Sequence, residues 1–225
     1  MRLLAGTVTA LLAVAGSSSQ LPERGAITGK VTLTTAVRGV PLASNVYQPR
    51  AVGRHDPGRT AEILNVLVFL KDASFSGTLP ASRQVVEQVN ESFVPRVVAV
   101  TRGSVVAFPN GDPYFHNVFS LSRAATFDLG RYRQGQTREE RFTKSGLIKV
   151  YCHIHSHMSA SIMVLDHPYF TVPRPDGTFT LPNVPPGKYT LVGWHERVGE
   201  RASSVVVEPG RTAALDLSLP VEDDR

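Results

Sequence analysis

Cysteine is almost absent from this chain: its 225 residues include only one, Cys152, beside one tryptophan and three methionines. A single cysteine cannot form a disulfide within its own chain, so a disulfide-stabilised scaffold is excluded. A free thiol is also a liability in an oxidising compartment. Coordination to a metal ion would explain the residue, because a coordinated thiolate is protected.

Several functional signatures are also missing. There is no glycine-rich phosphate loop, no evident hydrolase nucleophile motif and no run of basic residues, although the formal net charge is +5. Scattered lysines and arginines do not predict nucleic-acid binding. The positive balance fits an acidic redox partner or an anionic surface equally well.

Long hydrophobic runs are limited to residues 3–15, which follow Arg2 and end in the A-x-A sequence Ala13-Val14-Ala15. This combination predicts a signal peptide, residues 1–15, cleaved after Ala15. The run is too short for a membrane-spanning helix. We therefore expect a periplasmic or secreted protein with no membrane span after cleavage.

The rest of the chain consists of short apolar segments, many of them alternating with polar residues, separated by turns rich in Gly, Pro, Asn and Asp. No convincing amphipathic helix occurs. This pattern predicts an all-β fold made of sandwiches. Residues 39–61 are expected to form a loop, residues 75–83 a linker and residues 85–90 a strand.

Soft metal ligands are concentrated in residues 150–158, which read VYCHIHSHM. Cys152, His155 and Met158 are spaced as C-x-x-H-x-x-M, and a tight loop lets three such side chains converge on one ion. A thiolate, an imidazole and a thioether suit copper. The best candidate for a fourth ligand is His116, since two His, one Cys and a weak axial Met form a blue-copper electron-transfer site.

Further residues accompany this motif in a fixed order: Asn110, Asp112, His116, Asn117, Gly146 and Tyr151. Over residues 85–166 the chain therefore resembles cupredoxins of the plastocyanin and amicyanin kind. The resemblance implies a Greek-key β-sandwich and an electron carrier, not an enzyme, in which Asn117 ties the two ligand loops together. It implies one type 1 copper site with the ligands His116, Cys152, His155 and Met158.

The C-terminal part has a different pattern. Residues 177–191 read G-x-F-x-L-x-x-V-P-P-G-x-Y-x-L, which resembles the transthyretin-like sandwich of carboxypeptidase regulatory domains. The resemblance implies a cupredoxin domain inserted into a small transthyretin-like β-sandwich made of residues 24–80 and 167–221. The whole order is similar to exported bacterial proteins labelled methylamine-utilisation proteins.

Other assignments of the ligands remain open. His157 could replace His155, in which case Met163 would be the remaining methionine candidate, although Met163 lies in an apolar strand pattern. We expect His153 and His157 to point to solvent, His167 to lie between the domains and Trp194 to be buried. His195 and Glu196 are expected at the surface.

Two other functions also remain open. The protein could store, deliver or sense copper without transferring electrons. It could also be an interaction module with a structural copper site, which binds a protein or a carbohydrate, although no motif supports carbohydrate. A multicopper oxidase or nitrite reductase needs a further copper cluster, and the remaining histidines form no matching motifs. The expected partner is a redox protein.

Overall fold

The computed structural model describes residues 23–34 and 62–220. The expected signal peptide and the expected loop at 39–61, with His55, lie outside these residues. Within the described part, strands account for nearly all of the regular structure, and a short 3₁₀ helix, η1 (Glu62–Asn65), precedes β2. The predicted all-β fold is confirmed.

Four sheets carry the fold, and we number them by their place in the stack. The first sheet contains β14 (Thr178–Val184), β1 (Gly25–Leu33), β17 (Thr212–Ala214) and β18 (Leu217–Leu219). The second contains β13 (Phe170–Thr171), β2 (Val66–Lys71), β15 (Gly187–His195) and β16 (Gly199–Val207). The third contains β6 (Val97–Thr101), β12 (Ser159–Leu165), β11 (Gly146–Tyr151), β8 (His116–Ser122) and β9 (Ala125–Tyr132). The fourth contains β10 (Thr137–Arg141), β7 (Val105–Pro109) and β3 (Arg83–Val85).

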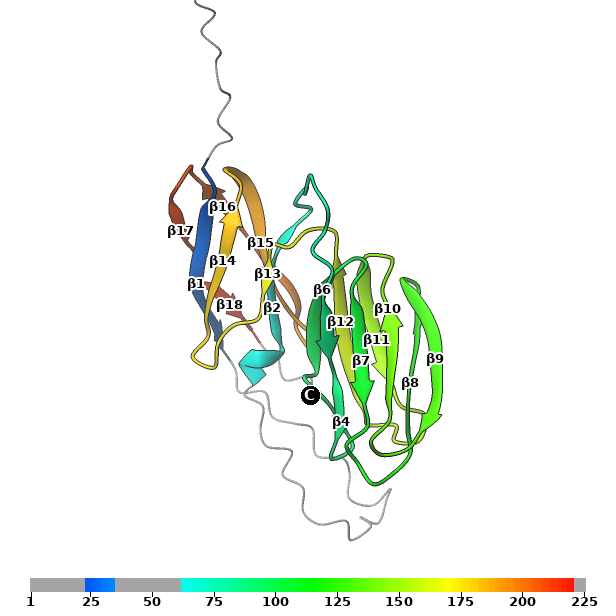
Figure 1. Cartoon of the computed structure of the whole chain (residues 1–225). Coiled ribbons are helices and arrows are strands. Elements are labelled where there is room, and N and C mark those ends of the chain that lie inside the picture. Colours follow the sequence, from blue (N-terminus) through cyan, green and yellow to red (C-terminus); the bar gives the residue numbers. More distant parts are fainter. Residues whose placement is uncertain (1–22, 35–61, 221–225) are drawn as a thin grey trace, which may run out of the picture.

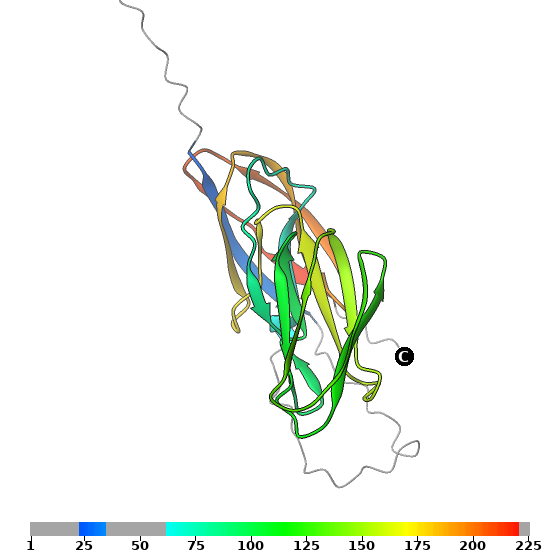
Figure 2. The ribbon, with the colours of Figure 1, turned by 45° about the vertical axis from the view of Figure 1, so that its right-hand side comes forward.

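Three hydrophobic cores separate these four layers. The first core joins the first and second sheets, through residues such as Ile27 and Leu191. The middle core joins the second and third sheets and includes Trp194 from the second and Met163 from the third. The third core fills the sandwich of the third and fourth sheets and includes Phe108. Figures 1 and 2 show the sheets containing β1 and β15 stacked beside those containing β12 and β7.

The inner strands are buried on both faces, which explains their continuous apolar sequences. In β12, Ile162 points into the third core and the adjacent Met163 points into the middle core. In β2, Val68 and Phe69 divide in the same way between the first and middle cores. Met163 therefore packs between the two sandwiches and away from the loop of residues 152–158.

We call the first and second sheets together the outer sandwich. The chain leaves the second sheet after β2 and returns to it at β13, so the third and fourth sheets are formed by the segment between these two strands.

A polar contact supplements the middle core. Glu196, after β15, bonds to Lys149 on β11 and accepts a hydrogen bond from Ser161 on β12. Arg96, before β6, lies 3.7 Å from the same carboxylate.

The expected strand at residues 85–90 is divided in the structure. β3 pairs with β7, whereas β4 (Glu87–Val89) pairs with β5 (Ser92–Val94) in a separate hairpin. The division falls at Val86, which is fully buried in the third core. The turn of this hairpin, Asn90-Glu91, lies at the end of the sandwich that carries the ligand loops (Figure 1).

Candidate metal centre

The candidate ligands come from the ends of neighbouring strands of the third sheet. His116 is the first residue of β8, Cys152 directly follows β11, and His155 lies in the loop that leads to β12. β11 pairs with both β8 and β12, so the sheet brings the two ligand segments together. The Asn110 side chain shapes the preceding loop, because it donates hydrogen bonds to the carbonyls of Tyr114 and Tyr132.

Three donor atoms converge at this end of the sandwich. The Cys152 Sγ lies 3.8 Å from the Nδ1 of His116 and 4.0 Å from the Nδ1 of His155, and the two nitrogens are 3.0 Å apart. The circle through these atoms has a radius of about 2.1 Å, close to the about 2.0–2.3 Å of metal–nitrogen and metal–sulfur bonds. The separations therefore fit one metal ion held by all three donors.

The orientation of His116 leaves its Nδ1 free to bind a metal. Its Nε2 lies 2.9 Å from the Oδ2 of Asp112, and both side chains are buried. The ring therefore donates its Nε2–H to the carboxylate. Its Nδ1 faces the His155 Nδ1 and the Cys152 Sγ, so this nitrogen is the one placed to bind a metal ion beside the sulfur.

The electrostatic environment also favours a cation. Burial would raise the pKa of the Cys152 thiol, but His116 and the N–H groups of Asn117, Ile154 and His155 stabilise the thiolate and hold the pKa below its ordinary value. Burial would lower the pKa of His116, but the thiolate and the Asp112 carboxylate raise it. The His116 ring therefore lies between two negative groups.

Met158 is buried in the third core, to which Cys152 also belongs. Its N–H donates to the carbonyl of His155 over 3.0 Å, which closes the loop into a tight turn. The sequence placed four side chains at this site: the structure gathers the donor atoms of three and places Met158 in the core that contains Cys152.

The flanking histidines lie outside the group. The His153 ring stacks on Phe119 at a centroid distance of 3.6 Å, and the His157 Nε2 lies 3.4 Å from Glu91. Both side chains are about half exposed, as predicted. Asn117 accepts a hydrogen bond from the His153 N–H at 2.7 Å and donates to Asp128, so it does connect the two ligand segments.

Sequence reasoning missed the structural roles of Asp112 and Glu91. Asp112 accepts hydrogen bonds from the N–H groups of Asn90 and Glu91, at 2.6 and 2.8 Å, in addition to the one from His116. Its position four residues before His116 is a weak signal, because the hydrogen bonds depend on a hairpin more than 20 residues away. The Asp112 carboxylate thus joins a ligand to the β4–β5 turn.

The prediction for His195 is wrong. Its side chain is 1% exposed, and its Nε2 lies 2.9 Å from the Oε1 of Glu62 in η1. His167 is also buried, where its Nδ1 accepts the N–H of Tyr169 and its ring stacks on that residue. Trp194 is buried as expected. Neither buried histidine joins the group at Cys152.

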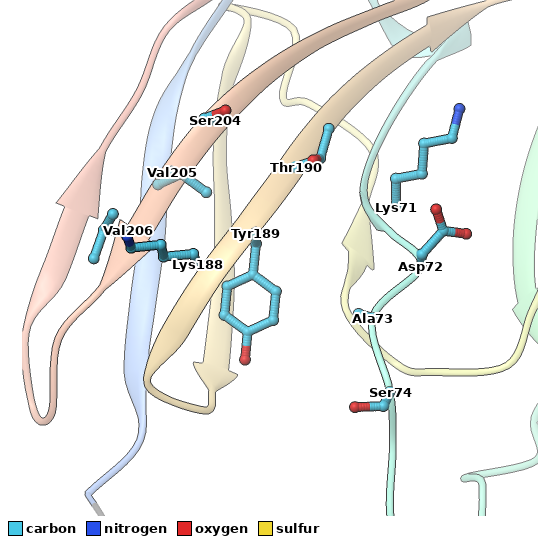
Figure 3. A pocket seen from close by; sticks show the side chains of 10 residues that line it. All are labelled: Lys71, Asp72, Ala73, Ser74, Lys188, Tyr189, Thr190, Ser204, Val205 and Val206. Atoms are coloured by element: carbon cyan, nitrogen blue, oxygen red, sulfur yellow. The ribbon is translucent and has the colours of Figure 1, made fainter.

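An open depression of about 480 Å³ lies on the second sheet (Figure 3), and none of the candidate metal ligands lines it. Two of its lining side chains have partners within the protein: Lys71 pairs with Glu200 at 2.8 Å, and the Tyr189 hydroxyl donates to the carbonyl of Pro185. These contacts assign no chemistry to the depression. In the described ranges, no helix has the length and apolarity needed to cross a membrane.

Comparison with known proteins gives partial matches. A family model described as "Polysaccharide lyase family 4, domain II" matches residues 153–215, which is less than half of the chain. No curated protein matches. The family model is not described as transthyretin-like, and that resemblance stays a prediction.

Similar solved structures include copper proteins. A Cu-containing nitrite reductase from Thermus scotoductus SA-01 is 26% identical over 42% of this chain and 24% of its own, with a TM-score of 0.35. The chain thus spans about a quarter of that protein. Amicyanin from Paracoccus versutus is 22% identical over 39% of this chain and 85% of its own, also with a TM-score of 0.35. An oxidized amicyanin mutant is 21% identical over 36% of this chain and 81% of its own, with a TM-score of 0.35. Each of these three matches covers less than half of this chain.

Proposed function

We propose that this protein is a type 1 copper protein that carries single electrons between redox partners. The observation that carries the proposal is the convergence of the His116 Nδ1, His155 Nδ1 and Cys152 Sγ within 3.0–4.0 Å at a largely buried point. Copper bound there would supply the Cu(I)/Cu(II) couple. Two imidazoles and a thiolate with a buried thioether nearby suit that ion better than magnesium or calcium, which prefer oxygen ligands.

The protein's contribution is a site that changes little between the two oxidation states. Asp112 fixes the His116 ring, and three backbone N–H groups face the Cys152 sulfur. Hydrogen bonds of this kind orient ligands and tune the potential of a metal. The visible spectrum of the copper-loaded protein tests the proposal: an intense thiolate-to-copper band is expected, and its absence after verified loading would contradict a type 1 site.

We assign the copper site to residues 85–166 and the outer sandwich to residues 24–80 and 167–221. A periplasmic or secreted location, a redox protein as partner and the lack of catalysis belong to the same proposal. The axial ligand is assigned to Met158, because it is buried with Cys152, whereas Met163 faces the middle core.

The axial assignment predicts opposite shifts in reduction potential. Met158→Gln should lower the potential, because an amide oxygen favours Cu(II) more than a thioether does. Met158→Leu should raise it, because loss of the axial donor destabilises Cu(II) more than Cu(I). Both variants should still bind copper. Voltammetry measures the shifts. Met163→Leu is the control: it should cost less than about 1.5 kcal/mol of stability and hardly move the potential.

His155 is the proposed point of electron exchange, since its side chain is 18% exposed whereas His116 is fully buried. Two exposed apolar residues lie close to it: Ile154 precedes it in the sequence, and the Tyr114 ring centroid is 6.3 Å from that of His155. Ile154→Glu should slow electron exchange with a partner without changing the spectrum, because it charges a small contact surface. Leu121→Glu, on an exposed position of β8, should have no effect. Equal rates for Ile154→Glu and wild type in stopped-flow mixing would rule out this surface.

Copper delivery is the second candidate, and the partial exposure of the His155 ligand favours it. A delivery site should lose copper to a chelator in seconds, whereas an electron carrier should retain it for hours. The rate of bleaching by an excess of chelator separates the two functions.

A further inference from the structure

A carboxylate lies between two imidazoles outside the buried donor group. The Glu91 Oε1 is 3.8 Å from the Nε2 of His155, and the Glu91 Oε2 is 3.4 Å from the Nε2 of His157. His155 turns its other nitrogen to the buried group, so its ring separates the two places. His157 and Glu91 are open to solvent, at 51% and 30% exposure of their side chains.

The backbone holds Glu91 in this position. Asn90 and Glu91 form a tight turn with φ angles of 53° and 52°, a conformation in which glycine is preferred at the second residue. The Asp112 carboxylate accepts the N–H groups of both residues, and the same carboxylate orients His116. Asp112 therefore connects the turn to the ligand His116, and this connection holds the backbone of Glu91 in place beside the buried site.

We propose that Glu91 and His157 bind a second metal ion, a borderline divalent cation such as Zn²⁺ or Cu²⁺, at the solvent side of His155. Their ligand atoms, 3.4 Å apart, fit the edge of a tetrahedral ion about 2.1 Å from each. Water completes the coordination. The ion lies against the outer edge of the His155 ring, so this site is a capture point from which copper reaches the buried donors.

A second His–carboxylate pair on the same loop provides an internal comparison. The His153 Nε2 lies 3.6 Å from the Oδ2 of Asp128. That carboxylate already accepts hydrogen bonds from Gly130 N–H and the Asn117 side chain, and the His153 ring is stacked on Phe119. These contacts give the pair a structural role. Glu91, in contrast, has no side-chain partner in the described residues other than the two imidazoles.

Titration of the metal-free protein with Zn²⁺ in a calorimeter tests the proposal. We expect two equivalents to bind to the wild type. Glu91→Gln and His157→Ala should each weaken the second equivalent at least about tenfold, since each removes a ligand. His153→Ala, which is equally exposed on the same loop, should keep both. A second equivalent unchanged in His157→Ala, or absent in the wild type, would overturn the outer site.

The outer site needs neither His116 nor Cys152, so its failure is separable from that of the proposed function. In Cys152→Ser, the Zn²⁺ equivalent that binds tightly at the buried donors should be lost. The Zn²⁺ equivalent that depends on His157 should remain. If both equivalents depend on Cys152, no independent outer site exists. A capture role further predicts that His157→Ala slows uptake of dilute Cu²⁺ several-fold, measured as the growth of the blue band. An unchanged rate would remove the capture role.

Discussion

Cys152→Ser should abolish the visible band of the copper-loaded protein. The band arises from charge transfer between the thiolate and copper, and an alcohol oxygen provides no comparable covalent bond. Serine is close to cysteine in size, and the side chain lies at a 3% exposed position, so the fold should persist. Absorption spectroscopy at equal, verified copper content measures the loss, and circular dichroism confirms the fold.

His153→Ala is the control for this substitution, because it alters the residue next to Cys152 without removing a proposed ligand. It should keep the band, and so should His157→Ala. If His157→Ala bleaches the protein and His155→Ala does not, the second imidazole ligand is His157, and the ligand assignment at His155 is wrong.

Asp112→Ala should be the most destabilising single substitution among the residues around the site. It removes an almost fully buried carboxylate and leaves three donors without their acceptor: the His116 Nε2–H and the N–H groups of Asn90 and Glu91. Each hydrogen bond to a charged group contributes about 1.5–3 kcal/mol, so we expect a loss of at least about 3 kcal/mol. Urea unfolding of the copper-free protein measures it.

Asp128→Ala is the matched control, since Asp128 also accepts a backbone N–H and faces a histidine but is half exposed. It should cost about 1 kcal/mol or less. In the copper-loaded protein, Asp112→Ala should also change the spectrum, because the His116 ring loses its orientation. Equal stability of the two variants would show that Asp112 does not hold the turn and the ligand together.

The sequence supports the all-β prediction because strand alternation and turn residues are local signals. The grouping of His116, Cys152 and His155 could also be predicted, because soft ligands at such spacing have few other uses. The burial of His195 could not, since it depends on Glu62, a residue 133 positions away. The role of Asp112 depends in the same way on a hairpin that closes more than 20 residues before it. The strand expected at residues 85–90 is interrupted at Val86, because the Val86 side chain packs into the third core.

The middle core has a thermodynamic consequence. Val97, Met163 and Trp194 belong to one apolar cluster that crosses the boundary between the two sandwiches, and β12 and β2 each contribute to two cores. Separation would expose this apolar surface to water, so the two sandwiches should melt in one cooperative transition. A metal bound at Cys152 stabilises only the native state, and its binding energy adds to the whole transition. Copper loading should therefore raise the melting temperature of the outer sandwich, although none of the four proposed ligands lies there.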